Sequence, residues 1–252
     1  MILHFLALDT VCAVLAWNLL ASSVLGTANS PLLLFWTGAA VWLVYIADRW
    51  LDSLPNSTEE HLSERHLFAA RHRGVIAIIW LGVWLISIMS ALIQLPGKIL
   101  LAGAFIAAMG VIYLILIQRT PHEDKKGRRR AGGGIVVGPL VALAVILFPA
   151  LNGSPKSTMI GVTWALIAWG FCLQTRSSRI WEEGGSISMA KTIFGGLTGC
   201  VLALSFGLLP IAAATVSLTI GLVLLNRFPL KDKVMGADWL LAIAGTVGWL
   251  AS

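Results

Sequence analysis

Charged residues are scarce in this chain of 252 residues: they make up 12% of it, where a soluble domain carries about 25%. Hydrophobic residues make up 58%, and the mean hydropathy is +0.86. These values exclude an ordinary soluble domain and indicate an integral membrane protein. The apolar stretches do not alternate with polar residues as in a membrane β-barrel, so we expect helical spans.

Cysteines are few, and the common catalytic and nucleotide-binding motifs are missing. Cys12, Cys172 and Cys200 lie in apolar stretches without CxxC spacing, which favours buried thiols over a disulfide or a metal site. Neither GxxxxGK[ST] nor GxGxxG occurs, and no Ser, His and Asp set has convincing spacing. The net charge of +6 reports topology in a membrane protein, and we expect no nucleic-acid partner.

Long apolar stretches divide the chain into nine expected transmembrane helices of about 20 residues each. The first lacks a preceding basic segment and a following cleavage site, so we interpret it as a retained helix and not as a signal peptide. We expect one domain, 1–252, an all-α polytopic membrane bundle of two four-helix repeats and a final helix, with a tight turn near Pro210. The expected spans are approximately 2–25, 31–51, 74–95, 98–118, 132–151, 158–175, 191–209, 211–226 and 235–252.

The charges are distributed unevenly over the two sides of this bundle. The side that holds the N-terminus has 16 of the 18 Lys and Arg and all 12 acidic residues, while only Lys98 and Lys156 lie near the other side. The positive-inside rule therefore predicts that the N-terminus lies in the cytoplasm and the C-terminus on the opposite side. We expect the protein in the cytoplasmic membrane. The expected cytoplasmic connections are 52–73, 119–131, 176–190 and 227–234, and we interpret the basic run 121–130 as a solvated connection beside lipid headgroups.

The second expected helix ends in two carboxylates on one face. Asp48 and Asp52 are four residues apart with Arg49 between them, and positions i and i+4 share a helix face. Two such carboxylates suit Mg²⁺, which prefers oxygen ligands and bridges to substrate phosphates, while Arg49 suits a phosphate directly. The segment that follows adds further candidates: Arg65, His66 and Arg73. Alternatively, these charges only terminate the span at the membrane interface.

A second polar segment follows the sixth expected helix on the same side. It holds Gln174, Arg176, Arg179, Glu182 and Glu183, and the spacings of three and four between Arg176, Arg179 and Glu183 predict a shared helix face. Two acidic segments that face each other across a bundle would clamp a diphosphate through metal ions. Polar residues within spans are functional candidates, which adds Asp9, Asn18 and Tyr45, although the Tyr45 hydroxyl alternatively satisfies a backbone carbonyl.

Other features have simpler interpretations. The 11 Trp residues fit aromatic belts at the membrane interfaces. Trp50 and Trp181 stand beside the polar segments and would alternatively line a cavity or stabilise a carbocation, with the interfacial interpretation favoured. We interpret 225–241 as an ordinary cytoplasmic connection, because Asp232 and Asp238 are six residues apart and do not share a face of one straight helix. Alternatively, Asn226 and Arg227 of this segment lie at the edge of a cavity.

Nine helices with acidic motifs after the second and the sixth resemble the UbiA superfamily of intramembrane prenyltransferases, and most closely a UbiA-like bacterial branch with degenerate acidic motifs. The likeness covers most of the chain in outline and is specific in 8–73 and 171–190, through LDTVCAVLAW, WLVYIADRWLDS, ERHLFAARHR and WEEGGSISMA. It implies Mg²⁺-dependent transfer of a polyprenyl group from its diphosphate to an aromatic or lipid acceptor. It implies metal-binding and catalytic roles for Asp48, Asp52, Glu182 and Glu183, and substrate binding by Arg49, Arg65, His66, Arg73, Gln174, Arg176, Arg179, Asn18 and Tyr45.

The acidic motifs depart from the pattern of that superfamily. Val44 and Tyr45 stand where the motif NDxxDxxxD has Asn and its first Asp, and Glu182 directly precedes Glu183 where the family spaces two Asp by four. Arg49, Arg176 and Arg179 would replace one metal ion in neutralising the diphosphate. A different class stays open: a non-catalytic UbiA-fold subunit that binds a lipid, pigment or quinone, or that assembles into a membrane complex. A transporter is less favoured, because its polar sites would lie near the midplane.

Overall fold

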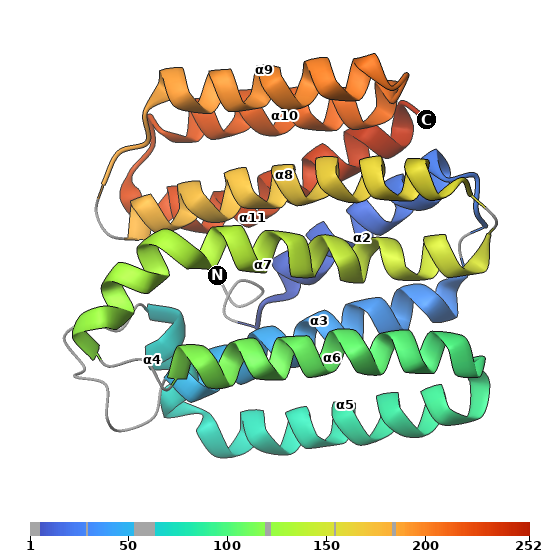
Figure 1. The fold of residues 1–252 in the computed structure, drawn as a ribbon. Coiled ribbons are helices and arrows are strands. Elements are labelled where there is room, and N and C mark those ends of the chain that lie inside the picture. The colour runs from blue at the N-terminus through green and yellow to red at the C-terminus, as the bar shows by residue number, and fades with distance from the viewer. Residues whose placement is uncertain (1–5, 29, 53–63, 119–121, 154, 183–184) are drawn as a thin grey trace.

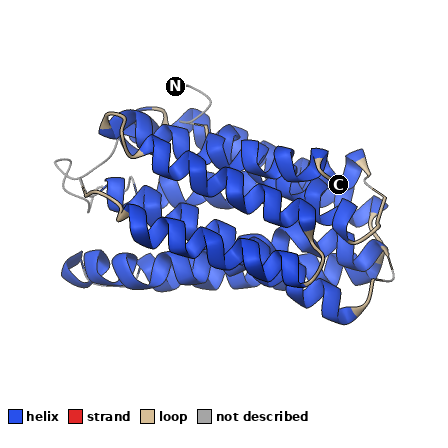
Figure 2. Cartoon of the chain, turned by 90° about the horizontal axis from the view of Figure 1, so that it is seen from above, coloured by secondary structure: helices blue, strands red, loops and turns tan. Residues whose placement is uncertain are grey.

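The computed structural model describes residues 6–28, 30–52, 64–118, 122–153, 155–182 and 185–252, and within these ranges the chain forms helices and no strand (Figure 2). Nine helices have 17 residues or more, and α4 is a short helix of 8 residues. The helices are α2 (Leu8–Val24), α3 (Pro31–Asp52), α4 (Glu64–Arg71), α5 (Arg73–Gln94), α6 (Gly97–Gln118), α7 (His122–Asn152), α8 (Ser157–Glu182), α9 (Met189–Ser205), α10 (Leu209–Leu225) and α11 (Leu230–Leu250).

The long helices run side by side along one axis, from α9 and α10 at the top of Figure 1, through α8 and α11 and then α7 and α2, to α3, α6 and α5 at the bottom. Helices α3, α6, α8 and α10 finish at one end of the bundle, here the charged end, and α2, α5, α7 and α9 finish at the other, here the short-loop end. The expected all-α bundle is confirmed. Its division into two four-helix repeats stays a prediction.

Two helices extend beyond the apolar stretches that predicted them. Helix α7 begins at His122 although we expected it at 132, and α8 continues to Glu182 although we expected its end at 175. The predicted connections 119–131 and 176–190 are therefore too long. The cause is that Lys, Arg and Glu are good helix formers, so a helix does not stop where its apolar residues stop.

A tight turn joins α9 and α10 just before Pro210. Helix α9 ends at Ser205, and Gly207 adopts a left-handed φ of 71°. The amides of Gly207 and Leu208 donate to the carbonyls of Leu204 and Ala203 at 2.9 and 2.8 Å, which is a Schellman motif. Pro210 lies in the first turn of α10, where its missing N–H has no intrahelical partner to lose. The predicted tight turn near Pro210 is confirmed, at 206–208.

Trp17 of α2 is at the centre of the largest core, which α2, α7, α8, α10 and α11 build together. Its side chain is fully buried, its Nε1 donates to the carbonyl of Leu241 at 2.9 Å, and its ring packs against Phe171. Helix α11 approaches α2 through Gly245, where an added Cβ would lie 2.8 Å from Trp17. Only glycine allows this close packing.

Helices α5 and α6 are apolar on all sides and pack little against the rest of the bundle. Ile78, Ile93 and Leu101 are 75%, 81% and 75% exposed. By length and composition α3, α5, α6 and α8 are able to cross a membrane, and α2, α9 and α10 are shorter apolar helices, as are the apolar parts of α7 and α11. Helices that are hydrophobic all round are typical of a membrane environment, because in water such a surface would be unstable.

Candidate functional site

A cavity of about 810 Å³ lies between α3, α5, α6 and α7, and it reaches α8 and α11 at the charged end. Its volume falls in the range of small-molecule binding sites, which is about 300–1,000 Å³. Most of its wall is apolar. Polar side chains line one end, which we call the polar end, and they include Asp48, Arg49, Gln174, Thr175, Ser178, Arg179 and Asp238.

The polar end combines residues from both segments that the sequence singled out. Asp48 and Arg49 come from the last turns of α3, and Gln174 and Arg179 come from the last turns of α8. Tyr45 lines the same cavity one helical turn before Arg49. The structure thus places five of the predicted site residues along one cavity, although they belong to helices far apart in the sequence.

Arg49 is almost completely buried, with 4% of its surface exposed, whereas Asp48, Arg179 and Asp238 are half-buried. A buried arginine is rare, because its charge loses hydration that only strong interactions replace. Electrostatic attraction between a charge and a ligand is stronger in a site with little water than at a surface. Arg49 is therefore well placed to bind an anionic group in the cavity.

Gln174 connects the polar end to the last helix. Its Nε2 donates to Asp238 Oδ1 at 2.6 Å and to Ser178 Oγ at 3.2 Å, and its Oε1 accepts from Thr175 Oγ1 at 3.3 Å. Thr10 Oγ1 of α2 lies 3.5 Å from Asp238 Oδ2, at the limit of a hydrogen bond. This network fixes the Gln174 amide and the Asp238 carboxylate in the cavity wall.

Asp238 is the site residue that sequence reasoning missed. The interpretation of 225–241 as an ordinary connection is wrong, because α11 begins at Leu230 and carries Asp238 into the cavity wall. Asp238 does not share a helix face with Asp232, but it needs no such partner to line the cavity. The available signal was different: a lone carboxylate within an apolar helix is itself a functional candidate.

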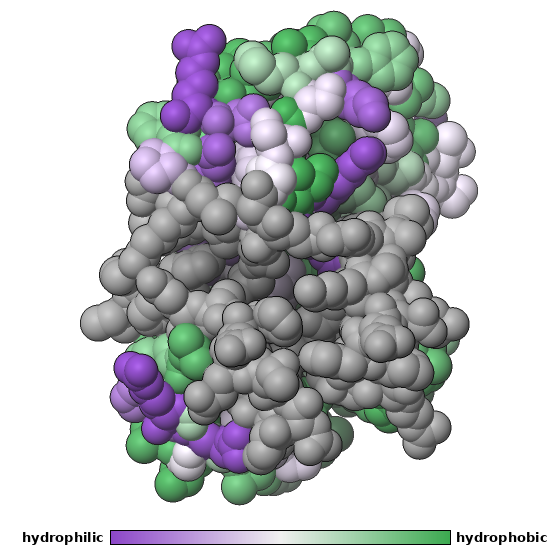
Figure 3. Space-filling model, turned by 90° about the vertical axis from the view of Figure 1, so that its left-hand side faces the viewer, coloured by the Kyte–Doolittle hydropathy of each residue, from purple (hydrophilic) through white to green (hydrophobic). Residues whose placement is uncertain are grey.

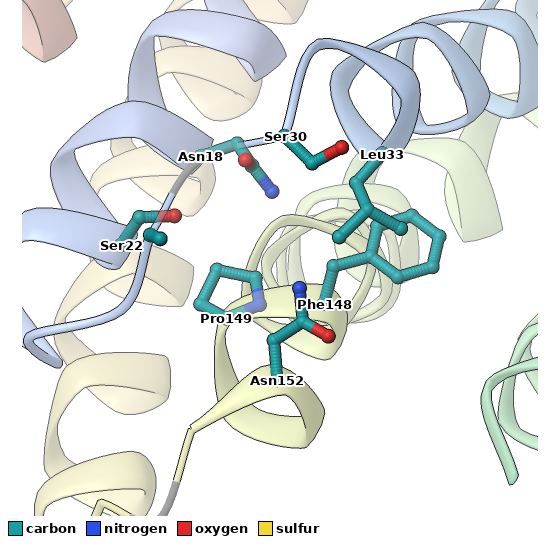
Figure 4. A pocket seen from close by; sticks show the side chains of 8 residues that line it. Asn18, Ser22, Ser30, Leu33, Phe148, Pro149 and Asn152 are labelled. Carbon is teal, nitrogen blue, oxygen red and sulfur yellow. The ribbon is translucent and has the colours of Figure 1, made fainter. Parts of the chain in front are cut away.

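Asn18 lies outside this cavity. Its side chain is 3% exposed and lines a separate small pocket with Ser22, Ser30 and Asn152 (Figure 4). The pocket, of about 10 Å³, has room for a single water molecule. Asn18 Nδ2 donates to the carbonyl of Val145 at 2.6 Å. That carbonyl would normally accept from the amide four residues later, which is Pro149 and has no N–H. Asn18 thus supplies the donor that Pro149 lacks.

Several predicted site residues lie at the margin of the described structure. Asp52 and Glu182 are the last residues of α3 and α8, Arg65 and His66 belong to α4, and the side chains of these four are outside the described part. Glu183 lies outside the described residues altogether. Arg73 begins α5 and is half-buried. Arg176 is exposed and does not line the cavity.

The charged end carries exposed basic side chains around the region where the polar segments meet. Hydrophilic residues border this face in Figure 3. Among the described residues the exposed basic ones near this end are Arg71, His72, Arg176, Lys191 and Arg227. Exposed basic side chains such as these attract anionic ligands and anionic lipid headgroups.

The aromatic residues of the cavity are not those that the sequence suggested. Trp36, Trp80 and Trp84 line it, and the rings of Trp80 and Trp84 are stacked with centroids 6.4 Å apart. Trp181 is fully buried in the main core, where its Nε1 donates to Asn226 Oδ1 at 3.1 Å, so its interfacial interpretation is wrong. Trp50 is half-buried outside the cavity wall.

Within the part of the chain that the structure describes, no group of three or more His, Cys, Asp and Glu side chains is arranged to hold a metal ion. Asp48 and Asp238 are the carboxylates that line the cavity there. No protein-family model matches the chain, and no curated protein and no solved structure matches it either.

Proposed function

We propose that the protein is an intramembrane prenyltransferase of UbiA-like fold, which transfers a polyprenyl group from its diphosphate to an aromatic or lipid acceptor. The observation that carries the proposal is the division of one cavity into a long apolar part and a polar end with Arg49 and Arg179. A polyprenyl diphosphate has the same division, an apolar tail and an anionic head. The resemblance of the two polar segments to UbiA motifs supports the same reaction.

The proposal places the bundle in the cytoplasmic membrane with the charged end in the cytoplasm. Four helices long and apolar enough to span a bilayer, and the exposed apolar faces of α5 and α6, support the membrane location. Of the 18 Lys and Arg, 16 belong to the side of the charged end, which supports a cytoplasmic N-terminus and an opposite C-terminus. A water-soluble acceptor would then arrive from the cytoplasm, and a lipid acceptor from the bilayer.

In the proposed reaction the bond between the allylic carbon and the diphosphate oxygen breaks, and the diphosphate leaves with the electron pair. The guanidinium groups of Arg49 and Arg179 stabilise the negative charge that develops on it. The nucleophilic atom of the acceptor forms the new bond to the allylic carbon and loses a proton, and Asp238 in the cavity wall is the proposed acceptor of that proton. The indole rings of Trp80 and Trp84 stabilise the carbocation, and the apolar wall excludes water that would capture it.

We propose that Mg²⁺ at the polar end is coordinated jointly by protein carboxylates and by the diphosphate, because the described residues alone do not complete its coordination. Magnesium sites on phosphates commonly use one or two carboxylates and complete their coordination with phosphate oxygens and water. Asp48 is the described carboxylate proposed to hold the ion, with Asp52 and Glu182, the last residues of α3 and α8, as proposed further ligands. Glu183, which follows Glu182 in the sequence, is a further proposed ligand. When bound, Mg²⁺ neutralises charge on the diphosphate.

Binding and release of the diphosphate test the proposal. Purified protein in nanodiscs would receive radiolabelled farnesyl or geranylgeranyl diphosphate, with Mg²⁺ or with EDTA, and both bound label and released diphosphate would be measured. Asp48→Asn and Arg49→Gln should each lower binding at least tenfold, whereas Arg227→Gln should not, because Arg227 is exposed and outside the cavity wall.

The same assay separates the catalytic proposal from the non-catalytic alternative. Metal-dependent binding followed by diphosphate release supports the transferase. Stable binding with no release, also after addition of cytoplasmic and lipid extracts as a source of acceptors, favours the non-catalytic lipid-binding subunit. No binding in protein shown to be folded would refute the diphosphate site.

A further inference from the structure

The cavity extends along the bundle from the polar end to a hydrophobic cluster at its far end. The wall follows α3 from Trp36 to Arg49, α5 from Trp80 to Leu92 and α6 from Ile99 to Leu114, and it includes Leu95 directly after α5. At the short-loop end these helices and α7 converge on a hydrophobic cluster, here the floor of the cavity: Trp36, Leu95, Ile99, Leu147 and Phe148. Trp36, Ile99 and Phe148 are each less than a tenth exposed, and Trp36 Nε1 donates to Ser90 Oγ at 3.0 Å.

The distance from the floor to the polar end follows from helix geometry. Asp48 comes 12 residues after Trp36 on the same helix, and at 1.5 Å per residue the two lie about 18 Å apart along its axis. Three backbone bonds span 3.8 Å across a trans peptide, so the four bonds of a trans isoprene unit span about 5 Å. The cavity therefore has the length of three to four isoprene units below a diphosphate at the polar end.

We infer that the cavity floor selects a prenyl tail of about four isoprene units, a geranylgeranyl group. This inference rests on the proposed diphosphate site and adds the tail length to it. A tail that leaves lipid for an apolar cavity gains little hydrophobic free energy, because both surroundings are apolar. Selection then depends on how well the tail fills the space. A shorter tail leaves a void above the floor, and a longer tail meets Trp36 and Phe148.

Glycines of α6 allow the available length to be changed without rebuilding the bundle. Gly103 lines the cavity about 6 Å above Ile99 by helix rise, and a Cβ added there would meet no atom within 4 Å. Gly110 lines it about 16 Å above Ile99, close to the level of the polar end, where an added Cβ would lie 4.0 Å from Val44. Leucine at either position would occupy space in the cavity. Gly82 of α5 provides a matched control, since it is equally open and does not line the cavity.

The test is competition between donors of different length. Protein in nanodiscs would bind radiolabelled geranylgeranyl diphosphate with Mg²⁺, against unlabelled geranyl, farnesyl, geranylgeranyl or octaprenyl diphosphate at equal mole fraction in the lipid. The expected result is a preference for geranylgeranyl diphosphate of about tenfold over geranyl and octaprenyl diphosphate. Gly103→Leu should move the preference to farnesyl diphosphate, Gly110→Leu should weaken all lengths, and Gly82→Leu should change nothing. Trp36→Ala, which opens the floor, should remove the discrimination against the octaprenyl donor. Trp249→Ala should not, because Trp249 is an exposed residue of α11 that does not line the cavity.

The outcomes separate this inference from the function on which it rests. Specific binding with equal affinity for all lengths, or a Gly103→Leu variant with the wild-type preference, would refute the length selection and leave the diphosphate site intact. A Gly103→Leu variant that still binds farnesyl diphosphate is folded, so its loss of the longer donor would support the inference. Absence of specific binding at every length would remove the proposed function and this inference together.

Discussion

Asn18 offers the sharpest test of whether a polar residue within this bundle serves the substrate or the fold. Leucine at this position would keep the volume and remove the hydrogen bond to the Val145 carbonyl. Val145 is fully buried, and Pro149 has no N–H to replace the lost donor. An unsatisfied buried carbonyl costs about 1–3 kcal/mol, although hydrogen bonds within membranes average about 0.6 kcal/mol. We therefore expect Asn18→Leu to destabilise the protein by about 1–2 kcal/mol, which lowers Tm by about 2–8 °C for a chain of this size.

A double-mutant cycle isolates the role of Pro149 in this cost. Pro149→Ala restores the backbone N–H that bonds the Val145 carbonyl within α7. In that background Asn18→Leu should cost less than about 0.5 kcal/mol, because the carbonyl keeps a donor. Unfolding by SDS in mixed micelles, followed by tryptophan fluorescence, gives the four free energies. An equal cost of Asn18→Leu in both backgrounds would refute the account of Asn18 as the replacement donor.

The same variant decides the functional role that the sequence predicts for Asn18. Because Asn18 lies outside the main cavity, Asn18→Leu should bind geranylgeranyl diphosphate with wild-type affinity in protein that remains folded. A tenfold loss of affinity in such protein would instead support substrate binding by Asn18.

Three further substitutions have expected outcomes. Gly245→Val should prevent close packing of α11 on Trp17 and lower Tm by more than 5 °C, which thermal unfolding in detergent measures. Gln174→Glu puts a second carboxylate at the position that now lies 2.6 Å from Asp238, so the variant should be less stable than wild type at neutral pH. It should regain stability as the pH falls below about 5, since one of the two carboxyls then takes a proton, and a pH-independent loss would contradict this. Ser87→Ala removes a buried hydroxyl without a hydrogen-bond partner among the described residues, and it should leave donor binding unchanged and stability unchanged or higher.

The sequence predicts the helices of this protein well because each is encoded by its own apolar stretch. Helix α3 has the expected start at residue 31, and the end is within one residue of the prediction, because Pro31 and the acidic Asp52 mark its limits. The ends of α7 and α8 could not be found in the same way. Their charged extensions are as compatible with a helix as with a loop, and hydropathy alone does not separate the two.

The sequence predicts which site residues lie close together only where both residues belong to the same helix. Asp48 and Arg49 are consecutive in α3, so their position at the end of that helix follows from the sequence. Gln174 and Asp238 are 64 residues apart, and their hydrogen bond depends on the packing of α8 against α11. Helical spacing contains no information about that contact. The floor of the cavity depends on several elements in the same way, since Trp36, Ile99 and Phe148 belong to α3, α6 and α7 and Leu95 directly follows α5.

The charges at the polar end determine how strongly the binding of a diphosphate should depend on Mg²⁺. The described residues there include two carboxylates, Asp48 and Asp238, and two guanidinium groups, Arg49 and Arg179, which sum to no net charge. A diphosphate brings about two to three negative charges into a cavity with little water, where uncompensated charge is unfavourable. The positive charge of the two arginines is already offset by the negative charge of the two carboxylates, so Mg²⁺ should be required for binding and not merely improve it. A neutral quinone or pigment would need no such ion. EDTA should therefore abolish binding of a prenyl diphosphate, and undiminished binding in EDTA would show that the head of the ligand is not a diphosphate held in this way.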